Sequence, residues 1–227
     1  MASSGRRFQR EGEGTAFERV AMFTDGVYAI ALTLIVVAIG VPALTDSGNA
    51  GELWRALGDH LRELVSFLVG VGVIGFYWTS HHEAFNRLDA VDRRYASWTV
   101  LYLGGVAFLP YPIRLVGSYA DNPVAWAVFA ANLAVVSSLE AVMFSHSWRA
   151  GLLRPGWTRP AYRWNLLMSL VPVPLFVLSV PVAFLAPRMT ALVWALTPLV
   201  QVAAGRGKPA ELPDDPDEGT SPLPPGR

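Results

Sequence analysis

Six long apolar stretches, separated by short polar segments, run along this chain. The first covers residues 19–41; it begins with a polar cluster and then has no charged residue from Gly26 to Thr45. A helix of about 20 apolar residues crosses a bilayer core of ~30 Å. Five further stretches contain at most one charged residue each and cover residues 64–80, 95–113, 122–148, 164–187 and 189–205. The pattern therefore predicts an all-α integral membrane protein with six transmembrane helices.

The first stretch carries a regular apolar stripe. Ile30, Leu34, Val37 and Val41 recur at positions i, i+4, i+7 and i+11, which places them on one face of a helix, and Thr33 brings a hydroxyl beside that face. Such a stripe usually faces lipid or packed neighbouring helices, whereas a ring of apolar residues around a pore forms a constriction that gates by dewetting. The spacing alone does not decide between these interpretations.

Composition supports a membrane protein. The chain of 227 residues is 52% hydrophobic and only 16% charged, whereas about 25% of the residues of a soluble domain are charged. The formal net charge is zero, so global charge gives no indication of a nucleic-acid partner. The chain contains no cysteine, which excludes disulfides, thiolate metal sites and cysteine nucleophiles.

The ends of the chain differ from its middle. Residues 1–18 are polar and of mixed charge, which predicts a mobile cytoplasmic arm, and residues 205–227 are rich in proline and acidic residues, which predicts a disordered cytoplasmic tail. Residues 19–204 then form the transmembrane domain. With the N-terminus inside, 14 of the 18 Lys and Arg residues lie in cytoplasmic segments. The positive-inside rule therefore predicts a multi-pass protein of the cell membrane with both termini in the cytoplasm.

Two acidic residues are candidates for chemistry. Asp25 lies in the first turns of the first predicted helix, where it either interacts favourably with the helix dipole or joins Arg19 and Thr24 in a buried polar network. Glu140 is the only acid in the fourth stretch. A proton-coupled transporter could use it, but the polar residues of the next turn, including His146, favour a local polar patch near the cytoplasmic end.

The chain has no motif of an enzyme or a metal site. His81 and His82 precede Glu83, but the zinc motif HExxH needs a second histidine where this chain has Asn86. A hydrogen-bonding role for His81 at a helix end is favoured. No nucleotide-binding glycine motif and no nucleophile motif is present, so we expect neither an enzyme nor a cofactor.

Three ordered motifs point to a family. RVAMFTD at residues 19–25, followed by GVYAIALTLIVV, resembles the RxxxFSD signature that opens the first helix of the transmembrane protein 175 potassium channels. YWTSHHEAF at residues 77–85 is similar to the end of that family's second helix, and FLPYP at residues 108–112 is similar to the end of its third. The resemblance covers about the first half of the chain, and the second half matches in the number of spans.

The resemblance implies a homotetramer of six-helix subunits in the lipid bilayer, with the four first helices around a central pore for potassium ions. It implies that Ile30, Leu34 and Val37 line this pore as a hydrophobic gate. It also implies that Thr33 contributes a weak preference for potassium over sodium. The implied polar network that holds the first helix in place comprises Arg19, Phe23, Thr24, Asp25 and His81.

This chain departs from the family pattern at two positions. Thr24 stands where the family usually has serine, and Val37 is smaller than the leucine often found there. The added methyl of Thr24 is expected to alter local packing, and the smaller Val37 is expected to widen the gate at its level. A secondary transporter coupled to protons or ions, or a non-conducting membrane scaffold, are the alternatives; a transporter predicts inverted repeats and paired broken helices, and the sequence shows neither.

Overall fold

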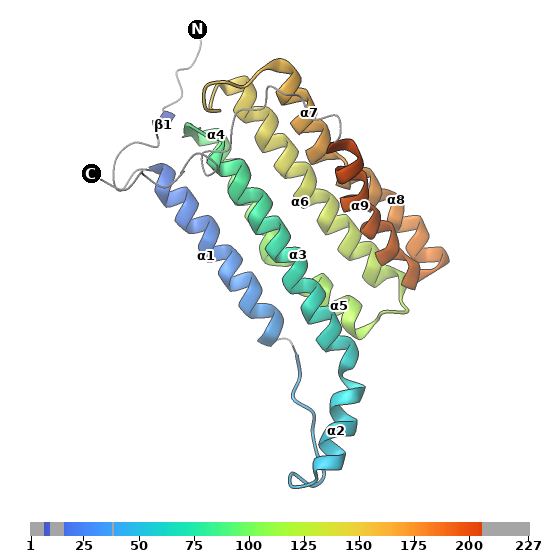
Figure 1. Ribbon diagram of the computed structural model, residues 1–227. Helices are drawn as coiled ribbons and strands as arrows, with labels where there is room; N and C mark the ends of the chain where they lie inside the picture. The colour runs from blue at the N-terminus through green and yellow to red at the C-terminus, as the bar shows by residue number, and fades with distance from the viewer. Residues whose placement is uncertain (1–6, 10–15, 38, 206–227) are drawn as a thin grey trace, which may run out of the picture.

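The computed structural model describes residues 7–9, 16–37 and 39–205, and its long helices lie side by side in one bundle (Figure 1). Two short strands, β1 and β2, pair antiparallel with Phe8 opposite Val91. The elements are β1 (Arg7–Gln9), α1 (Ala16–Val37), α2 (Ala50–Asp59), α3 (Leu61–Asn86), β2 (Ala90–Asp92), α4 (Arg93–Phe108), α5 (Pro110–Ser118), α6 (Pro123–Ala150), α7 (Arg159–Leu170), α8 (Pro172–Leu185), the 3-10 turn η1 (Pro187–Met189) and α9 (Thr190–Gly205).

Five helical segments are long and apolar enough to cross a membrane. They cover Phe17–Val37, Leu61–Asn86, Arg93–Ser118, Pro123–Ala150 and Arg159–Leu185. Two of these spans are interrupted, α4 from α5 directly before Pro110 and α7 from α8 directly before Pro172. Proline has no N–H to donate, and its ring clashes with the preceding helical turn. Pro110 and Pro172 therefore account for the two breaks. The predicted integral membrane class therefore agrees with the fold.

The sixth predicted span corresponds to α9. This helix packs along α8 (Figure 1), but its 16 residues reach only about 24 Å at a rise of ~1.5 Å per residue. That length is short of a ~30 Å hydrocarbon core. Five helical segments thus have the length and composition of membrane spans, and the sixth span stays a prediction.

Two predicted boundaries need correction. The first helix ends at Val37, so Val41 lies beyond it; glycine at position 40 and the proline after Val41 both disfavour helical backbone there. Helix α3 continues to Asn86, so His81 lies inside a helix and not in a polar connection over residues 81–94. His81 and Phe85 are buried against neighbouring helices, and this burial outweighs the polar character of the segment.

The connection between α3 and α4 is tied to the end of α6. Asp92 caps α4 by accepting a hydrogen bond from the backbone N–H of Tyr95 at 2.7 Å, and both its carboxylate oxygens lie 3.0 Å from Nε2 of His146. Burial acts to raise the pKa of Asp92, but these hydrogen bonds outweigh it and hold the pKa below its usual range. The predicted mobile arm includes β1, which pairs with this connection. The other residues of the arm up to residue 15, and the predicted tail after Gly205, lie outside the described residues.

Three glycines let the helices of the bundle approach closely. A Cβ atom added at Gly105 of α4 lies 2.7 Å from Cγ2 of Val136 on α6, one at Gly117 lies 2.8 Å from Oγ of Ser66, and one at Gly70 lies 2.9 Å from Cγ2 of Ile113. Small residues at such contacts are typical of helix packing in lipid, where van der Waals contact replaces the hydrophobic effect.

The Gly105 contact gives a direct test of this packing. We expect Gly105→Ala to lower the free energy of unfolding by about 1–3 kcal/mol, because Val136 is buried in α6 and a β-branched side chain in a helix has little rotamer freedom. Gly104→Ala is the matched control, since a Cβ at Gly104 meets nothing within 4 Å. Thermal unfolding of the detergent-solubilised protein compares them; equal melting temperatures contradict the close approach of α4 and α6.

Candidate functional site

Helix α1 lies at one edge of the bundle (Figure 1) and buries one of its faces. Phe17, Tyr28, Ala31 and Ile35 are each buried and pack toward α3, α4 and α5. Their spacing follows the helical period, so one stripe of α1 is held by the bundle. Val20, Ala21, Val27 and Leu32 are partly buried along the same stripe, and the opposite surface of the second half of the helix is exposed within the single chain.

The predicted pore-lining residues lie on this free surface. The exposed fractions are 59% for Ile30, 47% for Leu34 and 76% for Val37. Large apolar side chains that are exposed over several turns of a membrane helix contact lipid, another subunit or a pore. The structure therefore keeps all three available for contacts outside the single chain.

Thr33 is also exposed, next to Ile30. Its Oγ1 donates a hydrogen bond to the backbone carbonyl of Ile30 at 2.8 Å. The proton of the hydroxyl is therefore directed at its own helix, and the oxygen keeps lone pairs that can accept from water or contact a cation.

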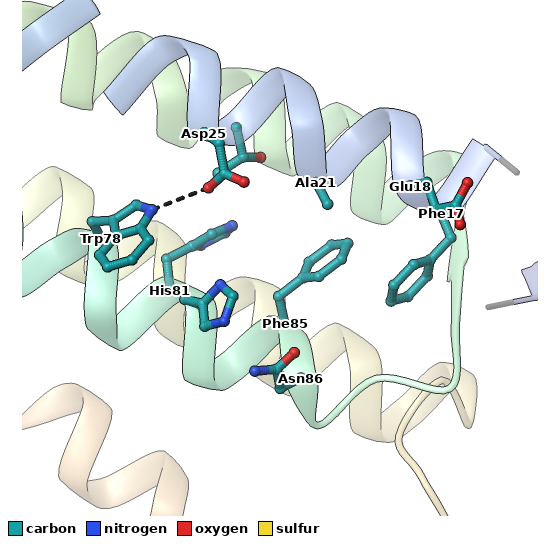
Figure 2. Close-up of a pocket in the computed structure, with 10 residues that line it drawn as sticks. Phe17, Glu18, Ala21, Asp25, Trp78, His81, Phe85 and Asn86 are labelled. Atoms are coloured by element: carbon teal, nitrogen blue, oxygen red, sulfur yellow. Dashed lines mark hydrogen bonds between the residues drawn. The ribbon is translucent and has the colours of Figure 1, made fainter. Parts of the chain in front are cut away.

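A cleft of about 320 Å³ opens between the first turns of α1 and the last turns of α3 (Figure 2). Across it, Nε1 of Trp78 donates a hydrogen bond to Oδ1 of Asp25 at 3.0 Å. The cleft is lined by Phe17, Glu18, Ala21, Thr24, Asp25, Trp78, His81, His82, Phe85 and Asn86. Part of the predicted network thus surrounds one polar junction between α1 and α3.

The residues predicted for the network take different places. Thr24 is buried and donates to the backbone carbonyl of Val20 at 2.9 Å. His81 is buried with its ring stacked on Tyr102 at 4.8 Å between centroids, and its Nε2 has no hydrogen-bond partner among the described residues. Arg19 and Phe23 are exposed, and in the described part of the chain no salt bridge reaches Arg19. The single chain therefore brings Thr24, Asp25 and His81 together and leaves Arg19 and Phe23 outside.

Several contacts of this region were missed from the sequence. The hydroxyls of Tyr28 on α1 and Tyr102 on α4 lie 2.7 Å apart, and both side chains are buried. Tyr77 and Ser137 form a similar buried pair at 2.7 Å between α3 and α6. A tyrosine inside an apolar membrane stretch needs a partner for its hydroxyl, and this was the available signal.

Glu140 belongs to a contact between helices and not to the polar patch with His146. Its Oε1 accepts a hydrogen bond from Oγ of Ser80 on α3 at 2.6 Å, whereas His146 contacts Asp92. Among the described residues, no group of three or more His, Asp or Glu side chains is arranged to hold a metal ion.

The Tyr28–Tyr102 pair can be tested by a double-mutant cycle. We expect Tyr28→Phe to lower the free energy of unfolding by about 1–3 kcal/mol, because it leaves the Tyr102 hydroxyl buried without its partner. The double variant Tyr28→Phe, Tyr102→Phe should recover most of this loss, since no hydroxyl remains. Chemical unfolding in detergent measures both, with the exposed Tyr111→Phe as a control. Strictly additive effects of the two substitutions disprove the coupling.

Known proteins resemble this chain in sequence and in fold. A family model described as endosomal/lysosomal potassium channel TMEM175 matches residues 19–110, which include most of α1 and all of α2, α3 and α4. The chain is 33% identical over 177 residues to a potassium channel of Streptomyces collinus, covering 76% of this chain and 84% of that protein. It is 32% identical over 131 residues to a potassium channel of Chamaesiphon minutus, covering 58% of this chain and 64% of that protein.

A solved structure has the same fold. It is the crystal structure of a homologue, from Chamaesiphon minutus, of the lysosomal potassium-selective channel TMEM175. The TM-score is 0.67 at 22% sequence identity, and the similarity covers 86% of this chain and 98% of that one.

Proposed function

The chain belongs to the TMEM175 potassium channel family, and we propose from this that it is a potassium-permeable cation channel. Membership of a channel family also confirms the prediction that the chain is not an enzyme. The observation that carries the proposal is the free apolar face of α1, because a pore-lining helix must keep one face away from its own subunit. Ile30, Leu34 and Val37 provide such a face.

In the proposed assembly, four copies meet with their α1 helices around a central axis. The bundle holds α1 at its edge by Phe17, Tyr28, Ala31 and Ile35, so four subunits can bring four α1 helices together without opening any subunit. The exposed apolar area on α1 supports an assembly of this kind, since such a surface is otherwise covered only by lipid.

The proposed gate is a hydrophobic constriction formed by rings of Ile30, Leu34 and Val37. A partly dehydrated cation is costly in an apolar ring, so the pore conducts when it widens and wets and is closed when it dries. Methyl groups cannot replace the hydration shell of an ion. Selectivity is therefore weak, and the accepting oxygen of Thr33 supplies the preference for potassium over sodium.

The proposed orientation places the arginine-rich end of the bundle in the cytoplasm of the cell, with the protein in the cell membrane. This end carries the start of α1, the connection between α3 and α4 and the connection between α6 and α7, and 14 of the 18 Lys and Arg residues lie in segments assigned to the inside. With α9 as a sixth span, both termini lie in the cytoplasm.

Ion flux tests the function. Purified protein in liposomes should carry potassium faster than sodium by a modest factor, with single-channel currents in planar bilayers. Slow, saturable uptake without single-channel currents indicates the secondary transporter instead, and the absence of any flux indicates the scaffold. Either result overturns the channel proposal.

The gate is tested by Ile30→Asn. A polar ring in the constriction favours wetting, so we expect a several-fold higher open probability or conductance. Ala29→Asn is the matched control, because Ala29 is exposed at nearly the same depth but about 100° around the helix. Single-channel recording compares the two; equal effects at both positions contradict a pore lined by the Ile30 face.

Selectivity is tested by Thr33→Val, which keeps the branched shape and removes the accepting oxygen. We expect the permeability ratio of potassium to sodium to fall toward one while conductance persists. Reversal potentials under bi-ionic conditions measure this ratio, and Thr33→Ser should retain it. An unchanged ratio in Thr33→Val excludes the hydroxyl from selectivity.

A further inference from the structure

A second concave surface lies away from α1, between α4, α6 and α7. It is a groove of about 670 Å³ near the arginine-rich end of the bundle. Its lining residues are Arg94, Ser97, Trp98, Ser138, Ala141, Val142, Ser145, His146, Arg149, Leu166 and Leu170. The channel proposal assigns no role to this groove.

The residues that line the groove change from charged to mainly apolar with depth along the helices. Arg94 is in the first turn of α4 and Arg149 is in the last turn of α6, so both lie at the arginine-rich end. Trp98 follows Arg94 by one helical turn, and Val142 precedes Arg149 by two. Leu170 lies nearly three turns into α7. The groove is therefore cationic at its mouth and apolar farther into the membrane.

The two arginines of the groove are available to an anionic ligand. Both side chains are exposed, and no salt bridge reaches either of them among the described residues. No described residue lining the groove is an Asp or Glu. Asp92, the acid nearest to Arg94 along the chain, already accepts hydrogen bonds from Tyr95 and His146.

We propose that this groove binds an anionic phospholipid, with its phosphate at Arg94 and Arg149 and an acyl chain along Trp98, Leu166 and Leu170. Guanidinium groups bind phosphate oxygens in bidentate geometry. Basic pockets between transmembrane helices at the cytoplasmic side are typical sites for acidic lipid headgroups. A soluble anion contacts only the arginines, whereas a lipid also fills the apolar part of the groove with an acyl chain. This inference rests on the proposed cytoplasmic position of the arginine-rich end, and it does not require ion conduction.

Native mass spectrometry of the full chain, titrated with phosphatidylglycerol and with phosphatidylcholine, tests the site. We expect tighter binding of phosphatidylglycerol, and an affinity about 30-fold lower in Arg94→Gln, Arg149→Gln, since each arginine near an anionic headgroup contributes several-fold. Affinity for phosphatidylcholine should not change. The conservative variant Arg94→Lys, Arg149→Lys should keep most of the preference, which separates lost charge from misfolding.

The matched control is Arg93→Gln, Arg159→Gln. It removes two exposed arginines at the same end of the bundle that do not line the groove, so its preference for phosphatidylglycerol should stay within about twofold of the unmodified protein. Equal losses in the two glutamine variants overturn the site, because the lipid is then held by general surface charge.

A second copy of the chain is the competing occupant of the groove. The natural chain has no cysteine, so Leu166→Cys places a single thiol in the groove. Under mild oxidation in a lipid membrane, the lipid site predicts no disulfide-linked dimer. Efficient dimer formation overturns the proposal and identifies the groove as a subunit contact.

Discussion

Hydrogen bonds inside the membrane hold α1 to the bundle by one face, and the rest of the arrangement depends on them. Between helices in lipid there is no hydrophobic driving force, so close packing and polar contacts must supply the association. Tyr28 provides one such contact to Tyr102, and Asp25 provides another to Trp78. Together with the packing of Phe17, Ala31 and Ile35 they fix which side of α1 is buried, and by exclusion which side presents Ile30 and Val37.

The remaining helices form a support that is independent of this face. Helix α6 packs against α4, α5, α7 and α8, and Gly105 of α4 allows a close approach to Val136 of α6. The Asp92–His146 pair joins the α3–α4 connection to the far end of α6. Such a support lets α1 keep a large apolar surface uncovered, because the stability of the bundle does not depend on burying it.

The sequence predicted the elements of the fold better than their contacts. Charge-free length located five segments that have the length and composition of spans in the structure, because this signal is local. The breaks before Pro110 and Pro172 follow from an equally local cause, the missing N–H of proline. The end of α3 was missed since burial of His81 arises from helices far along the chain. Thr24, Asp25 and His81 line the same cleft. Only the family resemblance linked His81 to the other two, and no signal in the sequence identified Trp78 as the partner of Asp25.

The two halves of α1 are held by different chemistry, and this bears on how a pore along it can move. The half that contains Asp25 and Tyr28 is fixed by directional hydrogen bonds. The part of α1 that contains Ile35 packs on Gly70, and a Cβ added at Gly70 would lie 3.3 Å from Cδ1 of Ile35. This contact is apolar. Among the described residues, no side-chain hydrogen bond joins this part of α1 to another helix. Apolar contacts are not directional and tolerate small sliding motions, so rotation is easier in this half. Of the proposed gate residues, Leu34 and Val37 lie toward this apolar end of α1, whereas Ile30 lies within one turn of the Tyr28 hydrogen bond.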